Sequence, residues 1–262
     1  MQISNVDFFL SWIVHLLLIV TRMSALFVFS PLLARQNIPA MAKVGFSLLV
    51  GAILINFNPP PAAYPYSDLY SLAFAVICEL SVGLVVGFVT LMFFNVVYTA
   101  AHIIDMQIGF SMAQIYDASA GGQVAVSSGL LNMVLVVSFI WSGGFSQLIV
   151  TMSRTFEIIP VGAGILRPEA AALAADVFIR CFGLAVQVAM PMLASALLLE
   201  VALGVVVRTA PQMNVFVVGI PIKVFIGLIV LMLMLPVFTN FSHEIFSEMF
   251  VYIDRMLGGM VP

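Results

Sequence analysis

The chain has 262 residues and a formal net charge of −3; 63% of its residues are hydrophobic and 8% are charged. Soluble domains carry about 25% charged residues, so this composition indicates a polytopic membrane protein. The acidic balance excludes a nucleic-acid-binding role, which needs a basic surface. The sequence contains no metal-binding His-Glu-x-x-His motif, phosphate-binding loop or catalytic cluster, so we expect no enzymatic activity and no cofactor.

Six apolar segments predict an all-α fold, because a helix needs about 20 mostly apolar residues to cross a bilayer. They cover residues 8–30, 41–57, 72–99, 124–141, 177–207 and 215–238. The second segment is short for a span and the fifth is long. We expect Pro191 to kink or split the fifth segment, and Pro221 and Pro236 to do the same to the sixth.

The regions between and after these segments differ in composition. Residues 58–67 contain four prolines, which favour an extended linker. Residues 143–175 contain four charged side chains and are expected to form the largest solvated connection. Residues 241–257 place apolar side chains on one stripe, which predicts an amphipathic C-terminal helix at a membrane surface or in the groove of a partner.

Small residues inside the apolar segments predict packing. Gly83 and Gly87 share a helix face with Glu79, and their spacing of four permits a second helix to approach closely. The two cysteines, Cys78 and Cys181, each lie inside an apolar run. We therefore predict buried core thiols and no disulfide.

Charged and titratable groups interrupt several apolar segments: His15, Arg22, Glu79, Asp176, Arg180 and Glu200. A charge near a helix centre costs at least ~2.5–3.5 kcal/mol on insertion scales, so each group is expected to have a partner. Spacing places His15 and Arg22 on one helix face and allows Asp176 to pair with Arg180. Two interpretations stay open, namely satisfied pairs within a bundle or between subunits, and a proton or substrate relay.

Residues 100–123 are too apolar for an exposed loop and too polar for a lipid-exposed span. Flexible methionines adapt to irregular surfaces, and two adjacent glycines supply a hinge. The segment is therefore a candidate for a deformable pore seal; the alternative is a re-entrant loop that packs beneath neighbouring helices. The candidate seal residues are Asp105, Met106, Ile108, Gly109, Phe110, Met112, Ile115, Tyr116, Asp117, Gly121 and Gly122.

Residues 208–223 place prolines and polar side chains between two apolar runs. A bare spacer would need only a few turn residues, so this chemistry predicts contact with another subunit; the alternative is a solvated hairpin turn. The candidate contact residues are Arg208, Pro211, Gln212, Asn214, Gly219, Pro221 and Lys223.

These turn residues, together with Gly227, resemble the late signature of the R subunit family of the flagellar type III export gate. A second match is IIDMQIGFSMAQIYD at residues 103–117, which is similar to the mid-chain Asp, Gly-Phe-x-Met-Ala, Asp segment of that family. The family usually follows the last Asp with Pro, whereas Ala118 follows here. The resemblance extends over nearly the whole chain.

The resemblance implies a structural, channel-forming subunit of the bacterial inner membrane and flagellar basal body that passes unfolded flagellar proteins. It implies helices paired into bent hairpins and an N-terminus on the periplasmic side. The chain would divide into N-terminal hairpins (1–99), a pore plug (100–123), C-terminal hairpins (124–240) and an amphipathic tail (241–262). The implied partners are the P and Q gate subunits, the substrate-specificity switch protein and the large export-gate receptor.

Two other functions remain open. A virulence type III secretion system would use a homologous subunit. A secondary transporter for small solutes or protons would show paired broken helices in its two halves. Pro191 and Pro221 interrupt adjacent segments of the same half, and the other half shows no matching break, so protein export is the preferred prediction.

Overall fold

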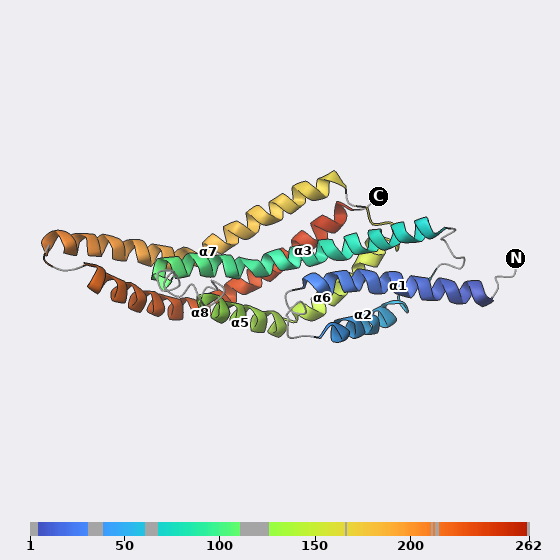
Figure 1. Ribbon diagram of the computed structural model, residues 1–262, viewed down its shortest axis with the longest axis horizontal. Coiled ribbons are helices and arrows are strands. Elements are labelled where there is room, and N and C mark those ends of the chain that lie inside the picture. Colours follow the sequence, from blue (N-terminus) through green and yellow to red (C-terminus); the bar gives the residue numbers. More distant parts are fainter. Residues whose placement is uncertain are drawn as a thin grey trace. The chain divides into compact units, whose positions relative to one another are not determined.

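The computed structural model describes residues 5–30, 39–60, 68–110, 126–165, 167–210, 212 and 215–260. The regular secondary structure of these ranges consists of seven α-helices (Figure 1). They are α1 (Asn5–Phe29), α2 (Ala40–Leu54), α3 (Leu69–Ile108), α5 (Val126–Trp141), α6 (Gly144–Ile158), α7 (Pro168–Thr209) and α8 (Val215–Gly258). Within the described residues, each of the six apolar segments contains an α-helix, so the predicted all-α fold is confirmed.

Among the described residues, four helices are long and apolar enough to cross a membrane: Phe9–Phe29, Leu69–Ile108, Pro168–Thr209 and Val217–Gly258. The helices α5 and α6, which are separated by a break at Ser142 and Gly143, would together make a fifth span. At 15 residues, α2 is shorter than the roughly 20 that a span needs. The chain is therefore a multi-pass membrane protein.

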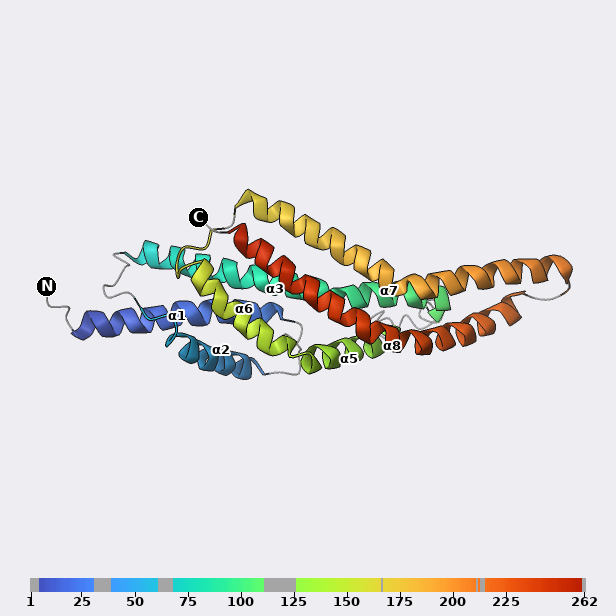
Figure 2. The same cartoon turned by 180° about the vertical axis from the view of Figure 1, so that it is seen from behind.

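The prolines inside the two longest helices do not end them. Pro191 lies within the 42 residues of α7, and Pro221 and Pro236 lie within the 44 residues of α8. Figures 1 and 2 draw each helix as one continuous coil. A proline removes a single backbone hydrogen bond, and the turns on both sides retain theirs, so of the two expected outcomes the split does not occur. Both helices instead change direction partway along their length (Figures 1 and 2).

The helices contribute to two compact units. Unit 1 comprises Met1–Phe93, Gly143–Phe178 and Glu248–Pro262, and unit 2 comprises Phe94–Ser142 and Ile179–Ser247. Each unit therefore combines segments that are far apart in the sequence. The long helices α3, α7 and α8 each supply one part to unit 1 and another part to unit 2.

In unit 1, α2 lies along α1 (Figures 1 and 2), and α1 packs closely against α3. A Cβ atom added at Gly83 would overlap the carbonyl oxygen of Arg22 and lie 2.7 Å from the Cβ of Ala25. One added at Gly87 would lie 2.8 Å from the Cβ of Phe29. The close helix approach that the glycine spacing predicted is therefore present.

The helix α6 corrects the expectation of a solvated connection over residues 143–175. Its buried residues include Leu148, Met152 and Phe156, which recur every four positions and so share one face. The charged residues Arg154 and Glu157 are exposed. This segment is an amphipathic helix whose apolar face contributes to the core of unit 1.

The C-terminal part of α8 is also amphipathic, as predicted, but its apolar stripe is covered by this chain. Met249, Ile253 and Leu257 are fully buried in unit 1. Farther on, a Cβ at Gly259 would lie 3.2 Å from Leu173 of α7. The tail is continuous with α8 and packs on its own fold, so this stripe is not available to a membrane surface or a partner.

In unit 2, three buried aromatic rings from three helices pack together. The ring of Phe94 in α3 lies 5.2 Å from that of Phe139 in α5, and Phe139 lies 5.0 Å from Phe246 in α8. Both contacts bury large apolar side chains. They hold α3, α5 and α8 together within this unit.

Substitution of Gly83 by alanine tests the close packing of α1 on α3. The added methyl group has no space beside the carbonyl of Arg22, so we expect a loss of about 1–3 kcal/mol from overpacking, seen as earlier thermal unfolding of the solubilised chain. The matched control is Gly45→Ala in α2, where a Cβ meets nothing within 4 Å. Equal unfolding temperatures for the two variants would contradict this packing.

Candidate functional site

Of the charged side chains whose burial the structure describes, the most deeply buried are Arg22 of α1 and Glu79 of α3, both in unit 1. Each side chain is fully buried. Arg22 Nε donates to Glu79 Oε2 at 2.6 Å, and Arg22 Nη2 donates to Glu79 Oε1 at 3.0 Å. The paired geometry matches the planar guanidinium to the carboxylate, which is the strongest form of this interaction.

Residues of α6 and of the chain after it complete this ion pair. Arg22 Nη1 donates to the Thr155 hydroxyl at 3.0 Å, and Nη2 also donates to the Ile159 carbonyl at 3.1 Å. The backbone N–H of Gly162, at a φ of 83°, donates to Glu79 Oε1 at 2.7 Å. The Arg22 guanidinium also lies 4.1 Å from the centre of the Phe156 ring. The charges are therefore satisfied inside this chain.

The other charged and titratable groups that the sequence places in or beside the apolar segments are less buried. His15 is half-buried, and its Nε2 lies 3.0 Å from the carbonyl oxygen of Asn58, which follows α2. Asp176 is exposed and Arg180 is half-buried. The structure thus joins Arg22 to Glu79, a pairing over 57 positions that helical spacing could not predict.

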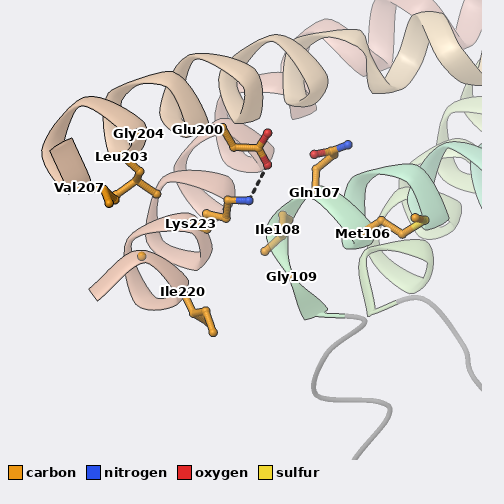
Figure 3. Close-up of a pocket in the computed structure, with 11 residues that line it drawn as sticks. Met106, Gln107, Ile108, Gly109, Glu200, Leu203, Gly204, Val207, Ile220 and Lys223 are labelled. Atoms are coloured by element: carbon orange, nitrogen blue, oxygen red, sulfur yellow. Dashed lines mark hydrogen bonds and ion pairs between the residues drawn. The ribbon is translucent and has the colours of Figure 1, made fainter. Parts of the chain in front are cut away.

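A second ion pair lies in unit 2, where α7 and α8 form a hairpin. Lys223 Nζ lies 2.6 Å from Glu200 Oε1, and the side chains are 28% and 50% exposed, respectively. Figure 3 shows these two groups pointing toward each other from α8 and α7. Lys223, expected to contact another subunit, therefore already has a partner in its own chain.

This ion pair borders a cavity of about 450 Å³. One wall comes from the last turn of α3, through residues 106–109, and the others come from α7 and α8 (Figure 3). Leu203, Val207 and Ile220 make the lining largely apolar, and Gln107 adds an amide. The cavity therefore combines an apolar interior with a few polar groups, as binding pockets commonly do.

The candidate seal residues that the structure describes differ in exposure. Asp105 and Ile108 are 2% and 1% exposed, whereas Met106 is 69% exposed. Gly109 has a φ of +96° directly after the last residue of α3. Residues 100–108 thus continue α3 as helix. The remaining candidates, Met112, Ile115, Tyr116, Asp117, Gly121 and Gly122, lie outside the described residues.

The turn candidates divide between two helices. Arg208 belongs to the exposed last turn of α7, and Gln212 is exposed. Gly219, Pro221 and Lys223 are part of α8, and Pro211 and Asn214 lie outside the described residues. Gly227 packs against Ile108, because a Cβ there would lie 2.7 Å from Ile108 Cγ1.

Sequence reasoning missed Thr155 and Gly162, which complete the buried ion pair. Both lie in the region expected to be solvated. The signal that could have revealed the first is the four-residue recurrence of Leu148, Met152 and Phe156, since Thr155 falls on the same face. Gly162 supplies only a backbone group, which no side-chain pattern reveals.

Comparison with known proteins gives the family of this chain. The family described as bacterial export proteins, family 1, matches residues 13–249. The chain belongs to this family. It is 31% identical to the flagellar biosynthetic protein FliR of Bacillus subtilis, over 88% of this chain and 90% of that protein. It is 27% identical to FliR of Escherichia coli, over 92% of both chains.

Membership of the export family extends beyond flagellar relatives. The chain is 28% identical to the Yop proteins translocation protein T of Yersinia pestis, over 82% of this chain and 84% of that protein. The predicted family is therefore confirmed, and the chain is a component of a protein export apparatus in a membrane. A transport component of this kind is not an enzyme.

A comparison of the two ion pairs tests how much Arg22 and Glu79 contribute to the stability of the fold. Glu79→Gln leaves a buried arginine without its counter-charge, and we expect a loss of about 3–5 kcal/mol in unfolding free energy. Glu200→Gln, in the half-exposed pair, is expected to cost less than about 1 kcal/mol. Chemical unfolding of the solubilised chain measures both.

The double variant Arg22→Met with Glu79→Met serves as the control for this experiment. It removes both charges together, so it should be more stable than Glu79→Gln despite the larger change. A double variant that is less stable than the single one would show that packing, and not charge pairing, dominates at this position.

Proposed function

We propose that this chain is a channel-forming core subunit of the flagellar type III export gate in the bacterial inner membrane. It would act through its shape and pass unfolded flagellar proteins across the membrane during flagellum assembly. Family membership supports a role in export, and the FliR relatives of Bacillus subtilis and Escherichia coli support the flagellar branch. The 28% identity to a Yop translocation protein supports a virulence secretion system as the second candidate.

The exposed hairpin of α7 and α8 is the observation that carries the subunit role. In an 18-residue apolar stretch of each helix, the buried share is 11% in α7 and 22% in α8. The corresponding share is 50% in α1 and in α3. Lipid could cover the apolar surface. The half-exposed ion pair of Glu200 and Lys223 on the same hairpin is costly to place against acyl chains. Other protein subunits satisfy both requirements.

The partners that we propose follow from this role. They are the P and Q subunits of the gate, the substrate-specificity switch protein and the large export-gate receptor, together with the unfolded export substrates. The end of α7 offers polar contacts for one of them, because Arg208 in its last turn and Gln212 beyond it are both exposed. We propose residues 208–223 as a subunit-contact surface on that basis.

We further propose that the plug of the channel lies within residues 100–123. The segments on either side would form its wall as N-terminal (1–99) and C-terminal (124–240) hairpins. The exposed Met106 and half-buried Phe110 support this role, since both present apolar surface outside the buried core. The buried Asp105 and Ile108 instead belong to the support of the plug.

Replacement of residues 110–113 by Gly-Ser-Gly-Ser tests the plug. The change keeps the length of the segment and leaves α3 intact, but it removes apolar side chains, so we expect gates that assemble normally and leak ions at rest. Ion leakage of cells carrying the variant gate is the measurement. Assembled gates with unchanged permeability would refute the plug assignment, and replacement of exposed Glu157 by glutamine provides the control.

Charge reversal tests the contact surface. We expect Arg208→Glu to reduce the yield of co-purified gate complex by roughly tenfold, because a reversed charge at an interface costs more than about 1.4 kcal/mol. The matched control is Arg154→Glu, on the exposed face of α6. Equal yields from the two variants would exclude Arg208 from the interface.

Lys223 needs a separate design because it pairs with Glu200. Lys223→Glu alone places two like charges together and should lower the yield. The exchange Lys223→Glu with Glu200→Lys restores the internal pair. If the exchange also restores the yield, Lys223 acts only within its own chain. If the yield stays low, Lys223 contacts a partner.

A further inference from the structure

The carboxylate of Asp105 is buried where α3 meets the beginning of α5. Asp105 is 2% exposed, and its two oxygens lie 3.3 and 3.4 Å from the backbone nitrogen of Ser127. The Ser127 hydroxyl donates to the carbonyl oxygen of Ala101, one turn earlier in α3, at 3.2 Å. Two adjoining turns of α3 therefore hold a single residue of α5.

The chemistry of a helix start explains why an acidic residue lies there. The first four N–H groups of a helix have no partner within it, and Ser127 is the second residue of α5. A negative charge near these groups also interacts favourably with the helix dipole. A capping residue normally precedes its helix, whereas Asp105 comes from another helix. It thus satisfies the start of α5 and also joins two elements.

The same turn of α3 is fixed on its other side. Ile108 is fully buried against α8, where Gly227 leaves space for it. Residues 106–109 then form one wall of the cavity that contains the Glu200–Lys223 ion pair. The last turn of α3 is thus held by α5 through Asp105 and by α8 through Ile108, while the neighbouring Met106 remains exposed.

We propose that Asp105 is a positioning residue of the gate, which clamps the end of α3 to the start of α5 and thereby keeps the resting channel closed. This role rests on the proposed function and refines it, because Asp105 then supports the plug from within the fold and does not line the pore. The clamp itself is a property of the folded chain. It can be measured separately from any leak.

Two substitutions break the clamp from opposite sides. Asp105→Asn weakens the acceptor. Ser127→Pro removes the donor, and proline is tolerated in the first turn of a helix. The matched control is Ser127→Ala, which loses the same hydroxyl as the proline variant but keeps the N–H. All variants are made in the full chain and purified with the assembled gate.

The first measurement is amide hydrogen exchange in the first turns of α5. We expect exchange to be roughly five- to tenfold faster in Asp105→Asn than in the unchanged chain, and likewise in Ser127→Pro relative to Ser127→Ala, as for the loss of a helix cap. The double variant should be no faster than the faster single variant, since both remove one interaction. Exchange rates that do not change in the single variants, or an increase in the double variant equal to the product of the two single increases, would overturn the clamp.

The second measurement is ion leakage of cells that carry each gate. We expect leakage from Asp105→Asn and Ser127→Pro but not from Ser127→Ala. Faster exchange without leakage would retain the clamp and overturn its role in closure. Leakage of Asp105→Asn without faster exchange would place Asp105 in the pore and overturn the proposal. If cells that carry the 110–113 replacement do not leak ions, the proposed plug is refuted. The exchange measurement still decides whether Asp105 joins α3 to α5.

A variant that does not assemble is compared by exchange in the solubilised full chain, with the same expected differences. Failure of Ser127→Ala to assemble would count against the proposal, because that variant keeps the N–H that Asp105 accepts from. Asp254→Asn makes the same chemical change at an exposed position of α8 and should alter neither measurement.

Discussion

The bidentate contact between Arg22 and Glu79 is the interaction on which the arrangement of unit 1 depends. Removing both charges from solvent is costly, and the cost is offset only when each donor and acceptor has a partner. The partners come from α1, α3 and the region of α6, so the contact selects one way of joining these elements. Arg22 also contributes its carbonyl to the close approach at Gly83, which brings the two helices within reach of a direct ion pair. In the described ranges, every buried side-chain polar atom has a hydrogen-bond partner.

Unit 2 follows a different physical rule. Its core of Phe94, Phe139 and Phe246 is apolar, and its ion pair lies at the half-exposed edge of the α7–α8 hairpin. Long apolar helices with so little internal contact are stable only with something around them. In unit 1 the buried charges are satisfied within the chain, whereas the α7–α8 hairpin of unit 2 leaves apolar surface exposed. This combination suits a subunit that folds partly alone and buries its remaining apolar surface on assembly.

The sequence predicted those features that depend on local spacing. Apolar runs located the helices, and the four-residue spacing of Gly83 and Gly87 predicted the close approach of a second helix. Features that depend on distant partners were not predictable, such as the ion pair formed by residues 57 positions apart. The apolar face of α6 does have a local signal in the sequence. Its charged residues suggest a solvated loop when composition alone is considered, whereas their positions place them on the exposed face of a helix. The sequence predicts the apolar stripe of the C-terminal helix, but not that this chain's own core covers it. Amphipathicity alone does not tell which surface covers the apolar side.

The two motifs that carried the family resemblance form one structure, although more than 80 positions separate them in the sequence. The first motif supplies Asp105 and Ile108 on the last turn of α3, and the second supplies Lys223 and Gly227 on α8. Gly227 is small because Ile108 occupies the space of its side chain, and residues 106–109 face Lys223 across the cavity. Residues that look like separate surface signals in the sequence thus determine how α3, α5 and α8 are held around a single turn. The last turn of α3 thus contacts α5 through Asp105 and α8 through Ile108, and this double attachment is the structural basis of the clamp that we propose.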